Sequence, residues 1–176
     1  MDKKKGCGVF TIKESNLNEG YFEVTNLKGL NLSGAELIEV NLERTNLKGA
    51  NLKGANLKGA NLEGANLEGA NLEGADLSWA ILRGANLEAT NLIEANLKKA
   101  NLKKANLEKA NLEKANLEGA NLKETHFLSF NQFSKVKTLY DAKLDEEFLI
   151  LLKGKHPRLF KSLEQQFLEH QSNLLL

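Results

Sequence analysis

The chain of 176 residues is long enough for one domain, and its 24 Lys and Arg residues nearly balance 23 Asp and Glu residues, for a net charge of +1. Near-neutrality gives no support to a polyanionic or polycationic role. One cysteine excludes an intramolecular disulfide framework and a metal site made of several cysteines, and no stretch approaches the roughly 18 apolar residues of a membrane span, so we expect a soluble, cytoplasmic protein.

Residues 1–11 precede the repetitive part of the chain, and we expect them to form an N-terminal cap segment. They contain three lysines at 3–5 and no apolar core of a secretion signal. A stack of repeats exposes apolar side chains at both of its ends. We therefore expect Val9, Phe10 and Ile12 to cover the first coil.

A period of five dominates residues 12–130. From 27 to 122 every fifth residue is Leu, and Ile12, Leu17, Phe22 and Phe127 lie in the same phase, so a step of five from 12 to 127 gives 24 blocks. The residue two before each Leu is small in most blocks, and the residue before it is usually Asn. On an α-helix a period of five would spread the leucines over every face, and on a flat strand it would point them to alternate sides. Both outcomes expose Leu, so we predict an extended step with Ala and Leu inward and Asn outward, followed by a corner.

Repeated corners coil the chain, and coils stack through backbone hydrogen bonds about 4.8 Å apart. Four blocks per coil would give about six coils and place each Leu over the Leu twenty residues away. Gly occupies the second corner position in ten blocks, where a type II turn requires positive φ. From Ala89 to Lys114 this position holds Ala, Glu or Lys instead, and there we predict a different turn type.

Blocks such as Ala-Asn-Leu-Lys-Gly and Ala-Asn-Leu-Glu-Gly resemble the pentapeptide-repeat family over about two thirds of the chain. The resemblance implies an all-β fold, a right-handed quadrilateral β-helix with four pentapeptides per coil. The stretches from Lys137 to Asp145 and from Lys155 to Phe160 are similar to the tails of cyanobacterial members of this family.

Beyond Phe127 the apolar spacing changes to that of a helix, and we expect residues 131–176 to form a short C-terminal α-helical cap. Asp145 is the expected N-cap of a helix that ends at Gly154. Pro157 suits the first turn of a second helix, whose apolar stripe would be Phe160, Leu163 and Phe167. These helices form either a lid on the last coil or a partner-binding pair.

The outward residues indicate a regular polar surface. Asn residues twenty positions apart should stack into ladders along the walls. Charges are banded, and the coil length predicts three ion pairs between coils: Lys48–Glu68, Lys53–Glu73 and Glu63–Arg83. Such a neutral, banded rod is a poor mimic of a polyanion.

A filled core of Leu and Ala leaves no cavity for catalysis, and we predict no catalytic, cofactor-binding or metal-binding residues. An enzyme would need a pocket between the last coil and the helical cap, with His126 or His156 in it.

Two groups of outward residues are candidates for recognition. Trp79 and Ile81 interrupt the polar pattern at a corner, and with Arg83 and Ile93 they form a candidate partner contact; the alternative is repeat drift, or a Trp79 ring that lies flat over the wall. The second group is the corner with Lys98, Lys99, Lys103 and Lys104. It is either a phosphate site or a solvated charge band, and the absence of interleaved aromatic residues argues against nucleic acid.

These observations favour a non-enzymatic structural or protein-interaction solenoid, with a regulatory role and a protein partner that the sequence does not identify. The resemblance implies one alternative, because some family members mimic DNA and occupy DNA gyrase. The near-zero net charge argues against that alternative here.

Overall fold

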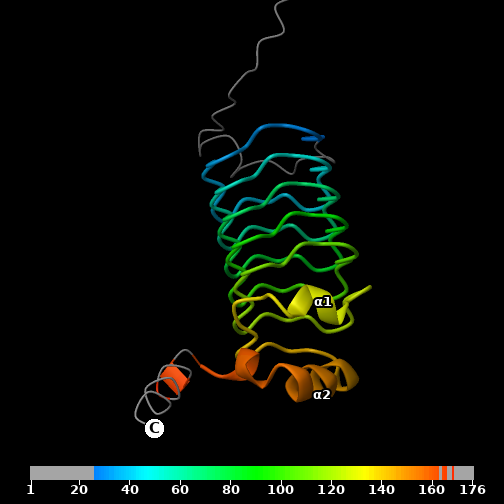
Figure 1. Ribbon diagram of the computed structural model, residues 1–176. Helices are drawn as coiled ribbons and strands as arrows, with labels where there is room; N and C mark the ends of the chain where they lie inside the picture. Colours follow the sequence, from blue (N-terminus) through cyan, green and yellow to red (C-terminus); the bar gives the residue numbers. More distant parts are fainter. Residues whose placement is uncertain (1–25, 163, 166–167, 169–176) are drawn as a thin grey trace, which may run out of the picture.

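The chain forms a stack of square coils, as a computed structural model that describes residues 26–162, 164, 165 and 168 shows (Figure 1). The expected N-terminal cap of residues 1–11 lies outside the described residues, as does Ile12. Backbone bridges join each outward residue to the one twenty positions later, from the pair Asn26–Asn46 to the pair Asn106–His126. Four pentapeptides per coil are therefore confirmed, and the fold is a repeat β-helix.

Each wall of a coil contributes one bridged residue rather than a strand, because the chain turns again after two more residues. Two backbone hydrogen bonds per block run to the following coil and one runs to the preceding coil, as for Leu47 to Asn66 at 2.7 Å, Gly49 to Glu68 at 2.9 Å and Asn51 to Leu30 at 2.9 Å. The backbone pairing expected of an all-β fold is thus present as isolated bridges. In the described part of the chain, no strand is longer than one bridged residue.

The interior is a continuous column of Leu and Ala. The leucines from Leu47 to Leu107 are fully buried, and so are most of the alanines two residues before them. No buried polar side-chain atom of the described residues lacks a hydrogen-bond partner. Burial of a Leu side chain contributes about 1.5–3 kcal/mol, and each Leu packs on its neighbours one coil away, so stability is shared between neighbouring coils.

The corners have one conformation throughout the repeats, so the prediction of a different turn type from Ala89 to Lys114 is wrong. The glycines at the second corner position have φ between 63° and 67°, and Ala89, Lys99 and Lys114 at this position have φ of 52°, 57° and 58°. From Gly29 to Lys104 the N–H of the residue at this position donates to the next coil whatever the side chain, as from Lys99 to Glu118 at 2.7 Å. This hydrogen bond holds non-glycine residues in the left-handed region at a cost of about 1–2 kcal/mol each.

The five-residue phase of the repeat ends before Phe127. The prediction that the Phe127 side chain points inward is therefore wrong. Phe127 is 66% exposed and has φ of 59°, and the next residue, Leu128, packs against the core instead. Helix α1, Phe130–Phe133, follows where the next wall would begin. The stacking then resumes with a spacing of 22 residues, since Asn116 pairs with Thr138 and Asn121 with Lys143.

Helix α2, Glu146–Lys155, has Asp145 as its N-cap, as predicted, and extends one residue beyond Gly154. The carboxylate of Asp145 accepts the backbone N–H of Glu124 at 3.0 Å instead of capping α2. Figure 1 shows α1 and α2 at the C-terminal end of the rod. Leu152 of α2 belongs to the hydrophobic core, and Phe148 of α2 contacts Phe133 of α1 edge-on, with ring centroids 5.5 Å apart.

The prediction of a second continuous α-helix, with Pro157 in its first turn, is wrong. Pro157–Phe160 is the 3-10 helix η2, and Lys161 is extended, so the stripe that begins at Phe160 is interrupted. Leu163 and Phe167 lie outside the described residues. The carbonyl of Leu159 in η2 accepts the N–H of Leu139 at 2.7 Å, because η2 continues the stacking on that wall.

Candidate functional site

Trp79 and Ile81 are two exposed apolar residues, separated by one residue, that interrupt the polar pattern of the outer walls. The Trp79 side chain is 54% exposed and that of Ile81 39% exposed. Trp79 occupies the second corner position, with φ of 63°, where most blocks have Gly. Ile81 occupies the bridged outward position, between Asn61 and Asn101, where the repeat has Asn. Both side chains therefore project from positions that face solvent in every block.

The coil length places the lysine cluster directly beside these two residues. Trp79 donates its backbone N–H to Lys98 at 2.9 Å, and Gly84 donates its N–H to Lys103 at 2.9 Å. The ammonium nitrogen of Lys99 lies 4.3 Å from the centroid of the Trp79 ring, within the range of a cation–π interaction. The two candidate groups of the sequence are thus one surface, which we name the Trp79 wall and define as residues 78–84 and 98–104.

The four lysines lie at two successive corners of one coil rather than at one corner. Three of them have carboxylate partners in the following coil: Lys98 lies 2.9 Å from Glu118, and Lys103 and Lys104 lie 2.8 Å and 3.4 Å from Glu124. The hydrogen bond from Lys103 lowers the pKa of the Glu124 carboxyl below its usual value, and the positive charges of both lysines add to this effect. The fourth lysine, Lys99, faces the Trp79 ring.

Arg83 belongs to the Trp79 wall, and Ile93 does not. Arg83 follows Ile81 at the next corner, and its guanidinium lies 3.8 Å from Glu63 in the preceding coil. Ile93 is only half-exposed and lies at a corner of the following coil that does not flank the bridged wall of Ile81. The structure therefore brings together Trp79, Ile81 and Arg83 but separates Ile93 from them.

The predicted ion pairs between coils are present. Lys48–Glu68 and Lys53–Glu73 both have N–O distances of 2.8 Å, and Arg83–Glu63 is the longest of the three. Because these side chains are partly exposed to solvent, each pair contributes about 0–1 kcal/mol. The asparagine ladders are present as well, since the side-chain amide of Asn61 donates to the side-chain oxygen of Asn41 at 3.1 Å. In most blocks the Asn side-chain oxygen also accepts the backbone N–H two residues later, as that of Asn61 does from Glu63.

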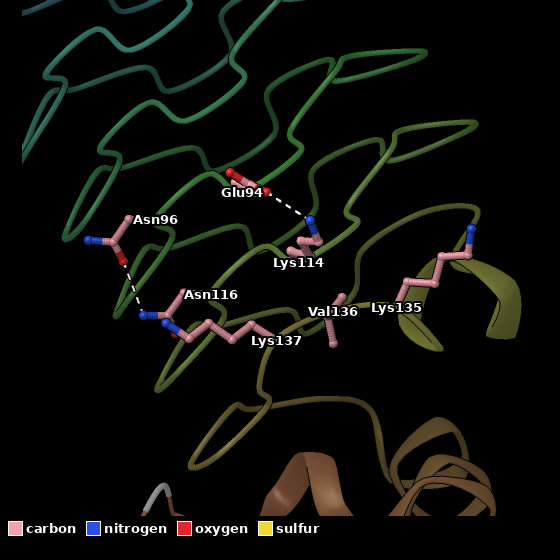
Figure 2. A pocket seen from close by; sticks show the side chains of 7 residues that line it. All are labelled: Glu94, Asn96, Lys114, Asn116, Lys135, Val136 and Lys137. Carbon is pink, nitrogen blue, oxygen red and sulfur yellow. Dashed lines mark hydrogen bonds and ion pairs between the residues drawn. The ribbon is translucent and has the colours of Figure 1, made fainter.

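Sequence reasoning missed a depression beside α1, which Figure 2 shows. Its volume is about 680 Å³, and it is lined by Glu94, Asn96, Lys114, Asn116, Lys135, Val136 and Lys137. Lys114 donates to Glu94 at 3.0 Å, and this hydrogen bond raises the pKa of the Lys114 ammonium. The change of the spacing from 20 to 22 residues occurs here, and a shifted copy of the repeat, Ala142-Lys143-Leu144, was the signal in the sequence.

The histidines of the enzyme hypothesis do not line this depression. A smaller neighbouring depression of about 370 Å³ is lined by Lys109, Ala110, Asn111, Leu112, Glu113, Asn131, Gln132 and Lys135, without His126 or His156. Among the described residues, no three side chains of His, Cys, Asp or Glu are grouped as metal ligands. In that same part of the chain, none of the helices has both the length and the apolar character to span a bilayer.

The model of the pentapeptide repeats family matches the chain in eight copies, over residues 12–44, 35–74, 50–88, 70–108 and 90–127. The chain belongs to the pentapeptide-repeat family. The square coils and the stacked asparagines described above are therefore features of a family member, whereas Trp79 and Ile81 depart from the block that this chain repeats.

Several solved structures of pentapeptide-repeat proteins are similar to the chain. HetL, a protein involved in heterocyst differentiation regulation in the cyanobacterium Nostoc sp. PCC 7120, is 33% identical over 69% of this chain and 62% of HetL, with a TM-score of 0.34. This chain therefore spans less than two thirds of the length of HetL. Rfr23 from the cyanobacterium Cyanothece 51142 is 32% identical over 69% of this chain and 88% of its own, with a TM-score of 0.32.

A second pentapeptide repeat protein from Nostoc PCC 7120 is 38% identical, over 65% of this chain and 84% of its own, with a TM-score of 0.36. A search of the curated proteins found no match.

Proposed function

We propose that this protein is a non-enzymatic, cytoplasmic interaction solenoid with a regulatory role, and that the Trp79 wall is the surface that contacts its protein partner. The observation on which the proposal depends is the exposure of Trp79 and Ile81 on a rod with a filled interior. In the cytoplasm the single cysteine of the chain would stay reduced.

The filled interior supports a binding role rather than catalysis. The column of buried Leu and Ala extends through the described coils, so only the outer walls and the two ends can meet another molecule. An exposed aromatic residue beside an aliphatic one is a typical anchor of a protein interface. Trp79 and Ile81 have this arrangement, and Arg83 beside them belongs to the residue types enriched at interfaces.

The proposal includes a right-handed winding, with residues 12–130 as the solenoid and residues 131–176 as its C-terminal helical cap. The contacts at that end support the cap. Phe133, Leu139, Leu144 and Leu152 are buried in the same hydrophobic cluster as the leucines of the repeats. A lid of this kind keeps the last leucines of the column away from water.

The charges argue against the alternative of a DNA mimic that occupies gyrase. The net charge is +1, and several of the carboxylates that face outward are paired with cations of a neighbouring coil, as Glu68 and Glu73 are. A mimic of DNA needs a continuous negative surface. The Trp79 wall is positive instead, with Arg83 and four lysines.

Affinity capture from native cells tests the proposal with variants that restore the regular block. The double variant W79G/I81N places Gly at a corner with positive φ and Asn in the ladder, so it should fold while it removes both apolar contacts. I38A, at another exposed apolar position, is the matched control. We expect one or more proteins to bind wild type and I38A but not W79G/I81N. Identical captured proteins for all three baits would refute the proposal.

A further inference from the structure

We infer that the Trp79 wall binds an acidic peptide segment of the partner, in which carboxylates flank an apolar side chain. This inference rests on the proposed function and specifies the chemistry of the partner. Its basis is that two exposed apolar residues, Trp79 and Ile81, lie beside a group of lysines that is about twenty positions later in the sequence.

The charge of the wall is one-sided. Residues 78–84 and 98–104 contain five cations, namely Arg83, Lys98, Lys99, Lys103 and Lys104, and no acidic residue. The carboxylates that pair with them belong to other coils: Glu63 on one side, and Glu118 and Glu124 on the other. The wall therefore presents a positive band with acidic residues only at its edges.

The cations of the wall are incompletely neutralised. Glu124 is shared by two ammonium groups, Lys103 and Lys104. Lys99 makes no ion pair with a carboxylate of the described residues, and its ammonium lies over the Trp79 ring instead. Arg83 meets Glu63 only at 3.8 Å. A further carboxylate placed between the two corners would gain charge-assisted hydrogen bonds from groups that already project into solvent.

The apolar part of the wall lies against this positive band. Ile81 is bridged to Asn101, which lies between the lysine pairs at 98–99 and 103–104, and Trp79 is next to Lys99. A peptide that places one apolar side chain between Trp79 and Ile81 would therefore bring its flanking residues to the lysines. Apolar anchoring with surrounding charge complementarity provides both affinity and partner selection.

A peptide accounts for the wall better than a single-stranded nucleic acid does. Surfaces that bind single strands have several rings on which successive bases stack. This wall has one ring, and Lys99 covers a face of it. Ile81 offers aliphatic contact, for which a phosphodiester backbone has no complementary group.

The only tryptophan of the chain provides a direct measurement of binding. The full chain is titrated with a fluorescein-labelled peptide of about twelve residues, composed of Glu, Asp, Leu and Phe, and both Trp79 emission and fluorescein anisotropy are recorded. The comparison probes are the same peptide with Gln and Asn in place of its acids, the same peptide with Ser in place of its apolar residues, and oligo-dT.

We expect the acidic apolar peptide to bind, to change the Trp79 emission and to bind more weakly as salt increases. K99Q/K104Q and W79G/I81N should each weaken binding about tenfold or more. K48Q/K53Q, which changes the net charge equally at corners outside the wall, should leave the affinity unchanged. Circular dichroism of each variant is the control that tests whether the coils are retained.

Several results would overturn the inference: no binding of the acidic peptide, equal binding of the uncharged peptide, an equal effect of K48Q/K53Q, or tighter binding of oligo-dT. Its failure is distinguishable from that of the proposed function. If W79G/I81N loses a captured protein while the acidic peptide does not bind, the interaction surface stands and its acidic preference is wrong. If capture is unchanged, both are wrong.

Discussion

The side-chain amide of Gln132 donates hydrogen bonds to the carbonyl of Leu107 at 2.7 Å and to that of Ala110 at 3.1 Å. In the repeats, a carbonyl at the position of Ala110 accepts a backbone N–H from the following coil, as that of Thr90 does from Asn111 at 2.9 Å. Helix α1 takes the place of that wall. The Gln132 amide therefore supplies the hydrogen bond that the regular coil would have supplied.

The variant Gln132→Leu tests this role. Without the amide, the carbonyl of Ala110 loses its hydrogen bond across the coils, so we expect the free energy of unfolding to fall by about 1–3 kcal/mol. Urea denaturation followed by circular dichroism measures the change. Asn131→Ala, at an exposed neighbouring position, is the control and should stay within about 0.5 kcal/mol of wild type. Equal stabilities of both variants would contradict the capping role.

A second prediction uses two residues at the same corner of successive coils, Gly69 with φ of 63° and Ala89 with φ of 52°. Ala89→Gly should raise stability by about 0.5–1 kcal/mol, because relief of left-handed strain exceeds the greater entropy of the unfolded chain. Gly69→Ala should lower it by a similar amount, since a Cβ there would meet no atom within 4 Å and only strain remains. Urea melts of the two variants should therefore shift in opposite directions; shifts of the same sign would show that corner strain does not control the stability of these variants.

A third prediction concerns the gap that Ile81 makes in an asparagine ladder. On this wall Asn61 donates to Asn41 at 3.1 Å and Asn121 donates to Asn101 at 3.4 Å, but no amide joins Asn61 to Asn101. Ile81→Asn should restore the missing side-chain hydrogen bonds and raise stability by about 0.5–1.5 kcal/mol. Thermal denaturation is the measurement. Ile81→Leu keeps the gap and should give no such gain, so an equal gain from both would exclude the ladder as its cause.

The Glu124 carboxyl, with its two lysine partners, predicts a dependence of stability on acid pH. Its pKa is lower in the folded chain than in the unfolded chain, chiefly because of the hydrogen bond from Lys103. The contribution to stability is therefore complete above the unfolded pKa and is lost as the pH falls through the folded pKa. We expect Glu124→Gln to lose less stability than wild type on acidification. Urea melts at neutral and acid pH measure this, and parallel losses in the two proteins would contradict the prediction.

The repetitive part of the fold could be predicted from the sequence because each block repeats one local constraint. Five residues fit neither a helix nor a strand, so the buried position of Leu47 and the outward position of Asn61 follow from a corner in every block. The pairing of Lys48 with Glu68 also needs four blocks per coil, the number that the family resemblance implies. The start of helix α2 after Asp145 could also be predicted, although the Asp145 carboxylate accepts the N–H of Glu124 rather than capping the helix.

The corners and the C-terminal end depended on contacts between distant residues. The preference of Lys99 against positive φ is overridden by the hydrogen bond of its N–H to Glu118, which belongs to another coil. The shift from a spacing of 20 to 22 residues arises where α1 replaces a wall and Leu139 joins the core beyond Leu117.

The candidate site likewise depended partly on the sequence and partly on contacts between coils. Its residues were visible as breaks in the repeat, since Trp79 and Ile81 replace Gly and Asn and the lysines form a cluster. The expected coil of twenty residues already stacks Lys99 on Trp79. Their union into one surface required the side-chain contacts of the folded chain, in which Glu118 pairs with Lys98 and the Lys99 ammonium lies over the Trp79 ring. Local patterns specify which side of the chain is buried, whereas neighbours from other coils select among the side-chain partners that each exposed residue could have.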